Sequence, residues 1–402
     1  MFVRTVPKPE RLGTATAYHT SNEEIGPMLP QQTRTIFLDQ LRAFVTVLVV
    51  VLHGSMSYMA YAPTWWYVVD SQQSIFFTML VLLIDVPIMP TMFFIAGYFA
   101  LPSLVRRGAV EFRREKFLRI GLPWLFGLLL LAPPITYMTY LSRGAPISLV
   151  EFWSSQFWSV AFQQSVYWFL GVLLFLFLGL SLAYQFGGAE TLQKRQLKLP
   201  DWRFFVTFLI VTGSAKLFLN QFFVVDSWFN NLYILVFQPL RVPLYLGYFW
   251  LGLHAYRRGW FTPDGYQPRS DYWIGWWIGT ATLYLVHRLY ILPADLEPRL
   301  AVQLLHAILL NAFCLSSLIF GLALFRTAAR ADHPIWRRLS AHAYGIYYVH
   351  PLILYPLAYL MLPITLPLPL KAPLVIFTAI LLSWAVSRFI LTRVVGLRRI
   401  FG

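Results

Sequence analysis

The chain is a succession of apolar runs, each close to twenty residues long, separated by short polar segments. A helix of about 20 apolar residues crosses the roughly 30 Å hydrocarbon core of a bilayer. Backbone groups in hydrocarbon need internal partners, and these runs lack the alternation of barrel strands. We therefore predict an all-α, polytopic integral membrane protein with ten transmembrane helices. The predicted spans are 36–59, 74–101, 118–141, 166–184, 204–225, 232–256, 272–292, 300–325, 341–362 and 372–392.

The composition agrees with a lipid environment. Of the 402 residues, 58% are hydrophobic and 12% are charged, which is too apolar for a water-soluble domain. A net charge of +15 raises the question of nucleic-acid binding, but most of the basic residues lie between the apolar runs instead of forming one patch. We expect the lipid bilayer as a partner and no nucleic acid. The single cysteine, Cys314, lies in an apolar run and excludes an intrachain disulfide framework.

The distribution of Lys and Arg predicts the orientation. Most of them lie in the two termini and in loops that follow even-numbered spans, whereas the other loops hold only Arg143, Arg299 and Lys371. Because cytoplasmic loops are enriched in Lys and Arg, both termini are expected in the cytoplasm. Residues 1–33 are polar and lack the apolar core of a signal peptide, so we expect a disordered cytoplasmic tail before one membrane domain, 34–402.

Ionisable residues inside apolar runs are candidates for a functional site, because each costs a few kcal/mol in the bilayer. Arg42 and His53 lie eleven residues apart, which is three helical turns plus roughly 20°, or about 16 Å along one helix face. Asp39 precedes Arg42 by three residues, so we predict an intrahelical ion pair near the cytoplasmic surface. The spans place Asp85 and His350 near the level of His53. This common depth favours a shared polar cavity, in which either residue could orient the ring of His53.

Aromatic residues gather in the first two outer loops. They fit either an interfacial belt or a carbohydrate-stacking surface, and we favour the belt. The residues concerned are Trp65, Trp66, Tyr67, Trp153 and Trp158.

Several motifs follow one another in a fixed order. They are FLDQLR at 37–42 with His53 eleven residues after Arg42, PTMFFIAGYF at 90–99, KFLRIGLP at 116–123, WFL at 168–170, the stretch 252–260, and LSAHAYGIYYVH at 339–350. This ordered set, which spans about residues 36–395, resembles the acyltransferase-3 family of membrane O-acyltransferases. The wording of the second and last motifs is most similar to the branch of periplasmic-glucan succinyltransferases.

The resemblance implies transfer of an acetyl or succinyl group from cytoplasmic acyl-CoA to a hydroxyl of a periplasmic or cell-envelope glycan. It also implies a multi-pass protein of the bacterial inner membrane, with acyl-CoA as donor substrate, a glycan or polysaccharide acceptor and no tightly bound cofactor. Acyl transfer needs a base that works near neutral pH, which a histidine provides. The expected catalytic residues are His53, as general base or transient acyl carrier, and Arg42 in support.

A second set of residues is expected to bind substrate. The basic cluster is suited to the donor's phosphates, because guanidinium and ammonium groups form charge-assisted hydrogen bonds with them. No metal site is expected. The predicted substrate-binding residues are Arg113, Lys116, Arg119, Asp39, Asp85, Trp168, Tyr347 and His350.

The main alternative is a secondary transporter or exporter of a glycan or small anionic solute, because proline-broken helices and midplane charges also build transport sites. Against it, the sequence shows no inverted repeat. The sequence also lacks a phosphate-binding Gly-rich lysine loop, a metal-ligand spacing and a Gly-x-Ser-x-Gly nucleophile turn.

Overall fold

A computed structural model describes residues 36–187, 199–230, 233–293, 299–328 and 333–401. The predicted tail, 1–33, lies outside the described residues. Within them the ordered elements are helices and no strand occurs, which confirms the predicted all-α class. The α-helices are α1 (Ile36–Met56), α2 (Ile75–Arg107), α3 (Ala109–Lys116), α4 (Leu122–Phe126), α5 (Ala132–Leu141), α6 (Leu149–Glu151), α7 (Trp168–Phe186), α9 (Trp202–Leu219), α10 (Val242–Arg257), α11 (Ser270–Val286), α12 (Leu300–Ala328), α13 (Pro334–Leu360), α14 (Leu368–Val386) and α15 (Val395–Phe401).

Single turns of other helix types connect or extend these helices. Five are π-helical and two are 3₁₀ turns among the described residues. The π-helical turns continue their neighbouring helices, so that α3, α4 and α5 form one long rod. These elements are η1 (Phe117–Gly121), η2 (Gly127–Leu131), η3 (Phe152–Gln156), η4 (Ser165–Tyr167), η5 (Pro239–Arg241), η6 (His287–Ile291) and η7 (Ser387–Leu391).

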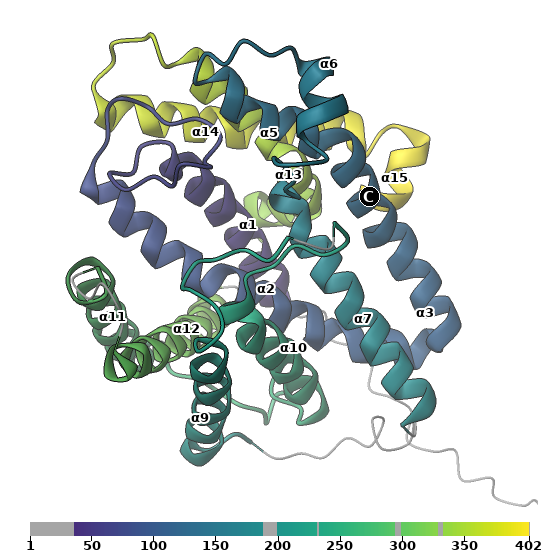
Figure 1. Cartoon of the computed structure of the whole chain (residues 1–402). Coiled ribbons are helices and arrows are strands. Elements are labelled where there is room, and N and C mark those ends of the chain that lie inside the picture. Colours follow the sequence, from purple (N-terminus) through teal and green to yellow (C-terminus); the bar gives the residue numbers. More distant parts are fainter. Residues whose placement is uncertain (1–35, 188–198, 231–232, 294–298, 329–332, 402) are drawn as a thin grey trace, which may run out of the picture. The chain divides into compact units, whose positions relative to one another are not determined.

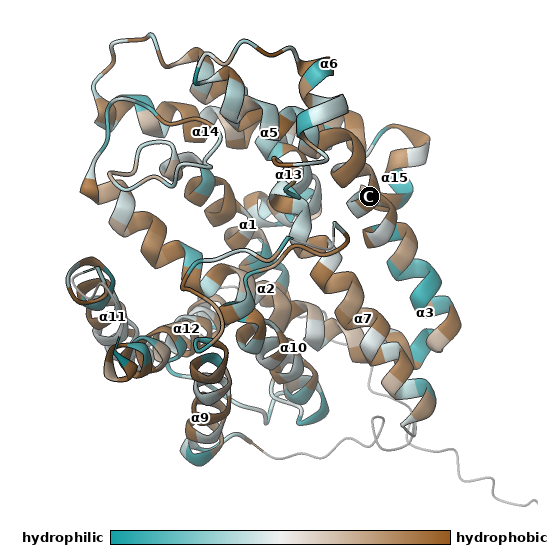
Figure 2. Ribbon diagram, viewed as in Figure 1, coloured by the Kyte–Doolittle hydropathy of each residue, from teal (hydrophilic) through white to brown (hydrophobic). Residues whose placement is uncertain are grey.

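Seven helices of the described chain are long and apolar enough to cross a membrane. They coincide with seven of the ten predicted spans, and the protein is a multi-pass membrane protein. The other three predicted spans fall on α10, α11 and α13. The count of ten spans and the cytoplasmic placement of the termini remain predictions. Figure 2 shows hydrophobic residues along most of α2 and α7, and hydrophilic residues gathered on α3.

Helix α1 packs against α2, α12, α13 and α14, so the first helix contacts the last third of the chain. Figure 1 shows α1 in purple beside α13 in yellow-green. At one end of this contact, the hydroxyl of Ser340 donates to the carbonyl of Asp39 at 3.1 Å. This packing brings the motif at 339–350 alongside the motif at 37–42 and His53.

Helices α2 and α10 approach each other closely at two glycines. A Cβ atom on Gly97 would lie 2.1 Å from the carbonyl oxygen of Phe249, and one on Gly252 would lie 2.0 Å from that of Phe94. Small residues permit such backbone contact between membrane helices. Both helices contribute residues to the cavity described below, so this contact fixes their relative position there.

The segment between α1 and α2 folds back over the C-terminal end of α1. The backbone N–H of Asp70 donates to the carbonyl of Ser57 at 2.9 Å, and the buried carboxylate of Asp70 pairs with Nζ of Lys371 in α14 at 2.6 Å. Arg143, after α5, donates to the carbonyls of Thr64 and Trp66 at 2.7 and 3.0 Å. These contacts fix the middle of the segment, including Trp66, above the end of α1.

Candidate active site

The described part of the fold contains a cavity of about 860 Å³, and residues of the loops that follow α1 and α5 help to line it. His53 from α1 and Asp85 from α2 both line it, which confirms the predicted shared cavity for these two residues. Trp168 and Tyr347, both predicted to bind substrate, line it as well. The cavity therefore joins α1, α2, α7 and α13 around His53.

His53 contacts His350 across the packed helices α1 and α13. Nδ1 of His53 lies 2.8 Å from Nε2 of His350, and the planes of the two rings are within 8° of parallel. On its other side, Nδ1 of His350 lies 2.7 Å from the carbonyl oxygen of Tyr347. That carbonyl is available because Pro351, four residues later, has no N–H to donate to it.

This chain of contacts assigns the protons of both neutral rings. A carbonyl oxygen only accepts, so Nδ1 of His350 carries the proton and Nε2 of His350 is the acceptor. Nδ1 of His53 is then the donor, and Nε2 of His53 keeps its lone pair. The arrangement holds His53 in the tautomer whose Nε2 can accept a proton.

Asp85 and His350 were both candidates to orient the His53 ring, and the structure places His350 in contact with it. His350 is fully buried behind His53 and does not line the cavity, whereas Asp85 is engaged with Arg241. His350 thus contacts the ring of His53 from behind, and of the two histidines only His53 lines the cavity.

Trp66 and Tyr67 are buried in the protein, each with only 3% of its surface exposed. The ring of Trp66 lies 5.7 Å from that of His53, and both aromatic residues line the cavity. The belt interpretation is therefore wrong for these two residues, because a belt residue must face the lipid–water interface. Trp65, which is 42% exposed, also lines the cavity.

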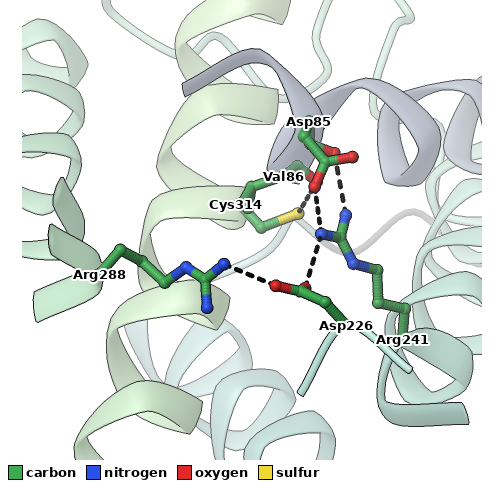
Figure 3. A network of polar contacts seen from close by, with 6 residues as sticks. All are labelled: Asp85, Val86, Asp226, Arg241, Arg288 and Cys314. Atoms are coloured by element: carbon green, nitrogen blue, oxygen red, sulfur yellow. Dashed lines mark hydrogen bonds and ion pairs between the residues drawn. The ribbon is translucent and has the colours of Figure 1, made fainter. Parts of the chain in front are cut away.

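One wall of the cavity is charged. Arg241 donates to the backbone carbonyl of Asp85 at 3.1 Å and is ion-paired with its carboxylate, while Asp226 lies 3.8 Å from Arg241 and 2.6 Å from Arg288 (Figure 3). Burial raises the pKa of the Asp226 carboxyl, but Arg288 and Arg241 outweigh burial and leave that pKa below its usual value. Asp226 is consequently an anion at neutral pH. Near this wall, Sγ of Cys314 lies 3.9 Å from the carbonyl of Val86, which Pro90 leaves without its helical donor.

The predicted ion pair of Asp39 and Arg42 is confirmed, with Nη2 and Oδ1 3.0 Å apart. Both residues lie at the N-terminal end of α1, outside the cavity. Arg42 and His53 are thus on the same helix, but the cavity reaches only His53.

The three basic residues predicted to hold phosphates also lie outside the cavity, and each has a partner in the chain. Arg113 donates to Ser181 and Gln185 of α7 at 3.0 and 2.9 Å. Nζ of Lys116 lies over the rings of Phe112 and Phe177, and Arg119 lies 3.7 Å from Glu115. Arg119 lies within the π-helical turn η1, whereas the other two lie in α3, so Arg119 does not continue their α-helical register.

Several residues that line the cavity were not selected from the sequence. Arg241 and Arg288 are charged residues inside predicted apolar spans, but their carboxylate partners could not be inferred from the sequence. The lining residues with amide side chains could not be recognised as site residues from the sequence, because polar residues are common in loops. The additional polar and aromatic lining residues include Thr136, Thr139, Gln163, Trp228, Asn230, Gln238, Arg241 and Arg288.

No group of His, Cys, Asp and Glu in the described ranges is arranged to hold a metal ion. In a comparison with protein-family models, residues 35–388 match the acyltransferase-3 model, described as an acyltransferase domain. Neither the search of curated proteins nor that of solved structures gave a match.

Proposed function

This chain belongs to the acyltransferase-3 family and is a membrane acyltransferase, and on that premise we propose that it transfers an acyl group from cytoplasmic acyl-CoA to a hydroxyl of a cell-envelope glycan. The acyl group is acetyl or succinyl, and the membrane is the bacterial inner membrane. The observation that carries the proposal is the oriented His53 on the wall of a cavity that is also lined by loops predicted to lie outside the cytoplasm.

The cavity lining supports a carbohydrate acceptor. Indole faces stack on sugar rings, and Trp66, Trp168 and Trp228 all line the cavity. Thr136 and Thr139 also line it, and their hydroxyl oxygens are buried with no hydrogen-bond partner among the described residues. Buried polar groups of this kind are normally satisfied, so these two are suited to hydrogen bonds with a sugar.

In the proposed reaction, Nε2 of His53 takes the proton of the glycan hydroxyl as the oxygen attacks the thioester carbonyl carbon. The tetrahedral intermediate then breaks its C–S bond, and the departing thiolate takes the proton from the His53 imidazolium. A hydroxyl is a weak nucleophile at neutral pH, and a positioned base accelerates such a step by about 10² to 10⁴-fold. His53 can alternatively carry the acyl group for one step, with the same overall balance.

Arg42 and the basic residues Arg113, Lys116 and Arg119 are proposed to serve the donor. Arg42 is fixed by Asp39 at the predicted cytoplasmic end of the helix that bears His53. Arginine suits this position because its planar, permanently charged guanidinium binds phosphate or carboxylate through two hydrogen bonds.

The test has two parts. Mass spectrometry of envelope glycans from cells with and without the protein should reveal an acetyl or succinyl increment that depends on it. Purified His53→Ala protein with unchanged yield and thermal midpoint should lose about 10² to 10⁴-fold in transfer of labelled acyl groups. Folded His53→Ala that retains more than about a tenth of the turnover removes His53 from the mechanism.

A further inference from the structure

The charged wall of the cavity contains more positive than negative charge. Three buried or partly buried cations, Lys216, Arg241 and Arg288, surround two carboxylates, Asp85 and Asp226 (Figure 3 shows all but Lys216). Arg241 is ion-paired with both carboxylates, and Asp226 is ion-paired with both arginines. Among these five described residues, one positive charge is left without an anionic partner.

Lys216 carries this excess. It lies in α9 with 2% of its surface exposed, and its Nζ has no hydrogen-bond partner among the described residues. Its charge interacts with those of Asp226, Arg241 and Arg288, although Lys216 itself does not line the cavity. A buried cation without a partner costs several kcal/mol, and ionisable groups inside a membrane protein commonly mark a substrate site.

Arg288 lines the cavity, whereas Lys216 does not. Its Nη2 contacts Asp226 at 2.6 Å, its Nε is buried and has no hydrogen-bond partner in the described chain, and the residue lines the cavity together with His53. A guanidinium has five N–H donors, and one carboxylate cannot use all of them. Arg288 therefore retains donors for a second anion.

We propose that Arg288, supported by Lys216 and Arg241, forms a subsite for a substrate carboxylate in the same cavity as His53. This inference rests on the proposed function and adds a substrate class to it: one of the two reactants carries a single negative charge near the reacting atoms. The carboxylate has two possible sources. It is either the free end of a dicarboxylic acyl group or an acidic sugar of the acceptor.

Matched substrate pairs distinguish these sources. The donor pair is acetyl-CoA and succinyl-CoA, and the acceptor pair is a neutral gluco-oligosaccharide and the same oligosaccharide ending in a uronate. For each pair we define the charge preference as kcat/KM for the charged member divided by kcat/KM for the neutral member. Arg288→Gln should lower the charge preference at least tenfold in one pair, which identifies the source.

Two further variants separate a binding role from a structural one. Asp226→Asn removes the anionic partner of Arg288 and so breaks the same ion pair. Because the donors of Arg288 are then free for a substrate, this variant should keep or raise the charge preference. Lys216→Met removes the unpartnered charge with little change in volume, so it should fold with an unchanged or higher thermal midpoint and lower the charge preference. Arg269→Gln, at an exposed arginine paired with Asp271 away from the cavity, is the matched control and should change nothing.

Binding provides a readout that does not require acyl transfer. Succinate and glucuronate are the charged probes, and succinamide and glucose are their neutral counterparts. At least one charged probe should raise the thermal midpoint of the wild-type protein, and Lys216→Met should abolish that rise. If this pattern holds without any transferase activity, the subsite stands and the proposed function fails.

Two results overturn the subsite. One is equal loss of activity on charged and neutral substrates in both Arg288→Gln and Asp226→Asn, which indicates a purely structural ion pair. The other is a wild-type protein that neither prefers a charged substrate in either pair nor responds to either charged probe.

Discussion

His350 accepts a hydrogen bond from His53 at 2.8 Å, although 297 positions separate the two residues in the chain. The acceptor nitrogen of His350 is defined because its other ring nitrogen donates to the carbonyl of Tyr347. One buried backbone carbonyl, freed by Pro351, thus determines which nitrogen of His53 is basic. In many enzymes a fixed acceptor orients a catalytic histidine. Here the acceptor for His53 is the neutral imidazole of His350.

The first prediction tests this relay. His350→Phe fills a similar volume but offers no acceptor to Nδ1 of His53, so the ring is free to adopt the unproductive tautomer. We expect kcat to fall at least tenfold with KM changed less than threefold, because the substrate contacts remain. His350→Gln, whose side-chain carbonyl can accept the hydrogen bond, should recover part of kcat. Equal kcat in the Phe and Gln variants would show that the acceptor is irrelevant.

The second prediction concerns the donor. Lys116→Gln with Arg119→Gln should weaken coenzyme A binding at least tenfold, since each charge-assisted hydrogen bond contributes about 1.5–3 kcal/mol. Calorimetry in neutral detergent measures this without an anionic bilayer, which removes any contribution from lipid headgroups. Arg398→Gln with Arg399→Gln in α15 is the matched double control. If both double variants bind coenzyme A like the wild type, Lys116 and Arg119 serve the helix packing alone.

The third prediction concerns the contact between α2 and α10. Gly97→Ala places a methyl group where only about 2 Å is available, against backbone that cannot rotate away. We expect a loss of roughly 1–3 kcal/mol or more, measured as a lower thermal midpoint in detergent. Gly213→Ala, in α9 with no neighbouring atom within 4 Å of the new Cβ, should be neutral or slightly stabilising. Similar midpoints for the two variants would contradict the close contact.

The fourth prediction concerns the buried pair of Asp70 and Lys371. Lys371→Met leaves a carboxylate that is 2% exposed without its cation and should cost about 3–5 kcal/mol of stability. The double variant Asp70→Asn with Lys371→Met should recover most of that loss, because neither charge then remains buried alone. Chemical denaturation of the three proteins measures the difference. A double variant as unstable as Lys371→Met would show that the unpaired charge of Asp70 is not the cause of the loss.

Local features were predictable from the sequence because they depend on residues close together in the chain. The helical period places Asp39 three residues before Arg42, and the ion pair follows from that spacing wherever the helix is located. The length of each apolar run fixes which segments can cross the bilayer, and it set the depth at which His53 and Asp85 line one cavity.

The partners of these residues were decided only by the tertiary structure. An apolar helix face packs equally well against lipid or another helix, so the neighbours of α1 could not be inferred from the sequence. The structure places His350 of α13 beside His53, whereas Asp85 of α2 is paired with Arg241. The loop aromatics illustrate the same limit, since Trp66 suits a membrane interface or a cavity wall. Its position was determined by two residues far away in the chain, Arg143 and Lys371. Arg143 donates to the carbonyl of Trp66, and Lys371 pairs with Asp70 of the same loop, so that the loop is held over the end of α1.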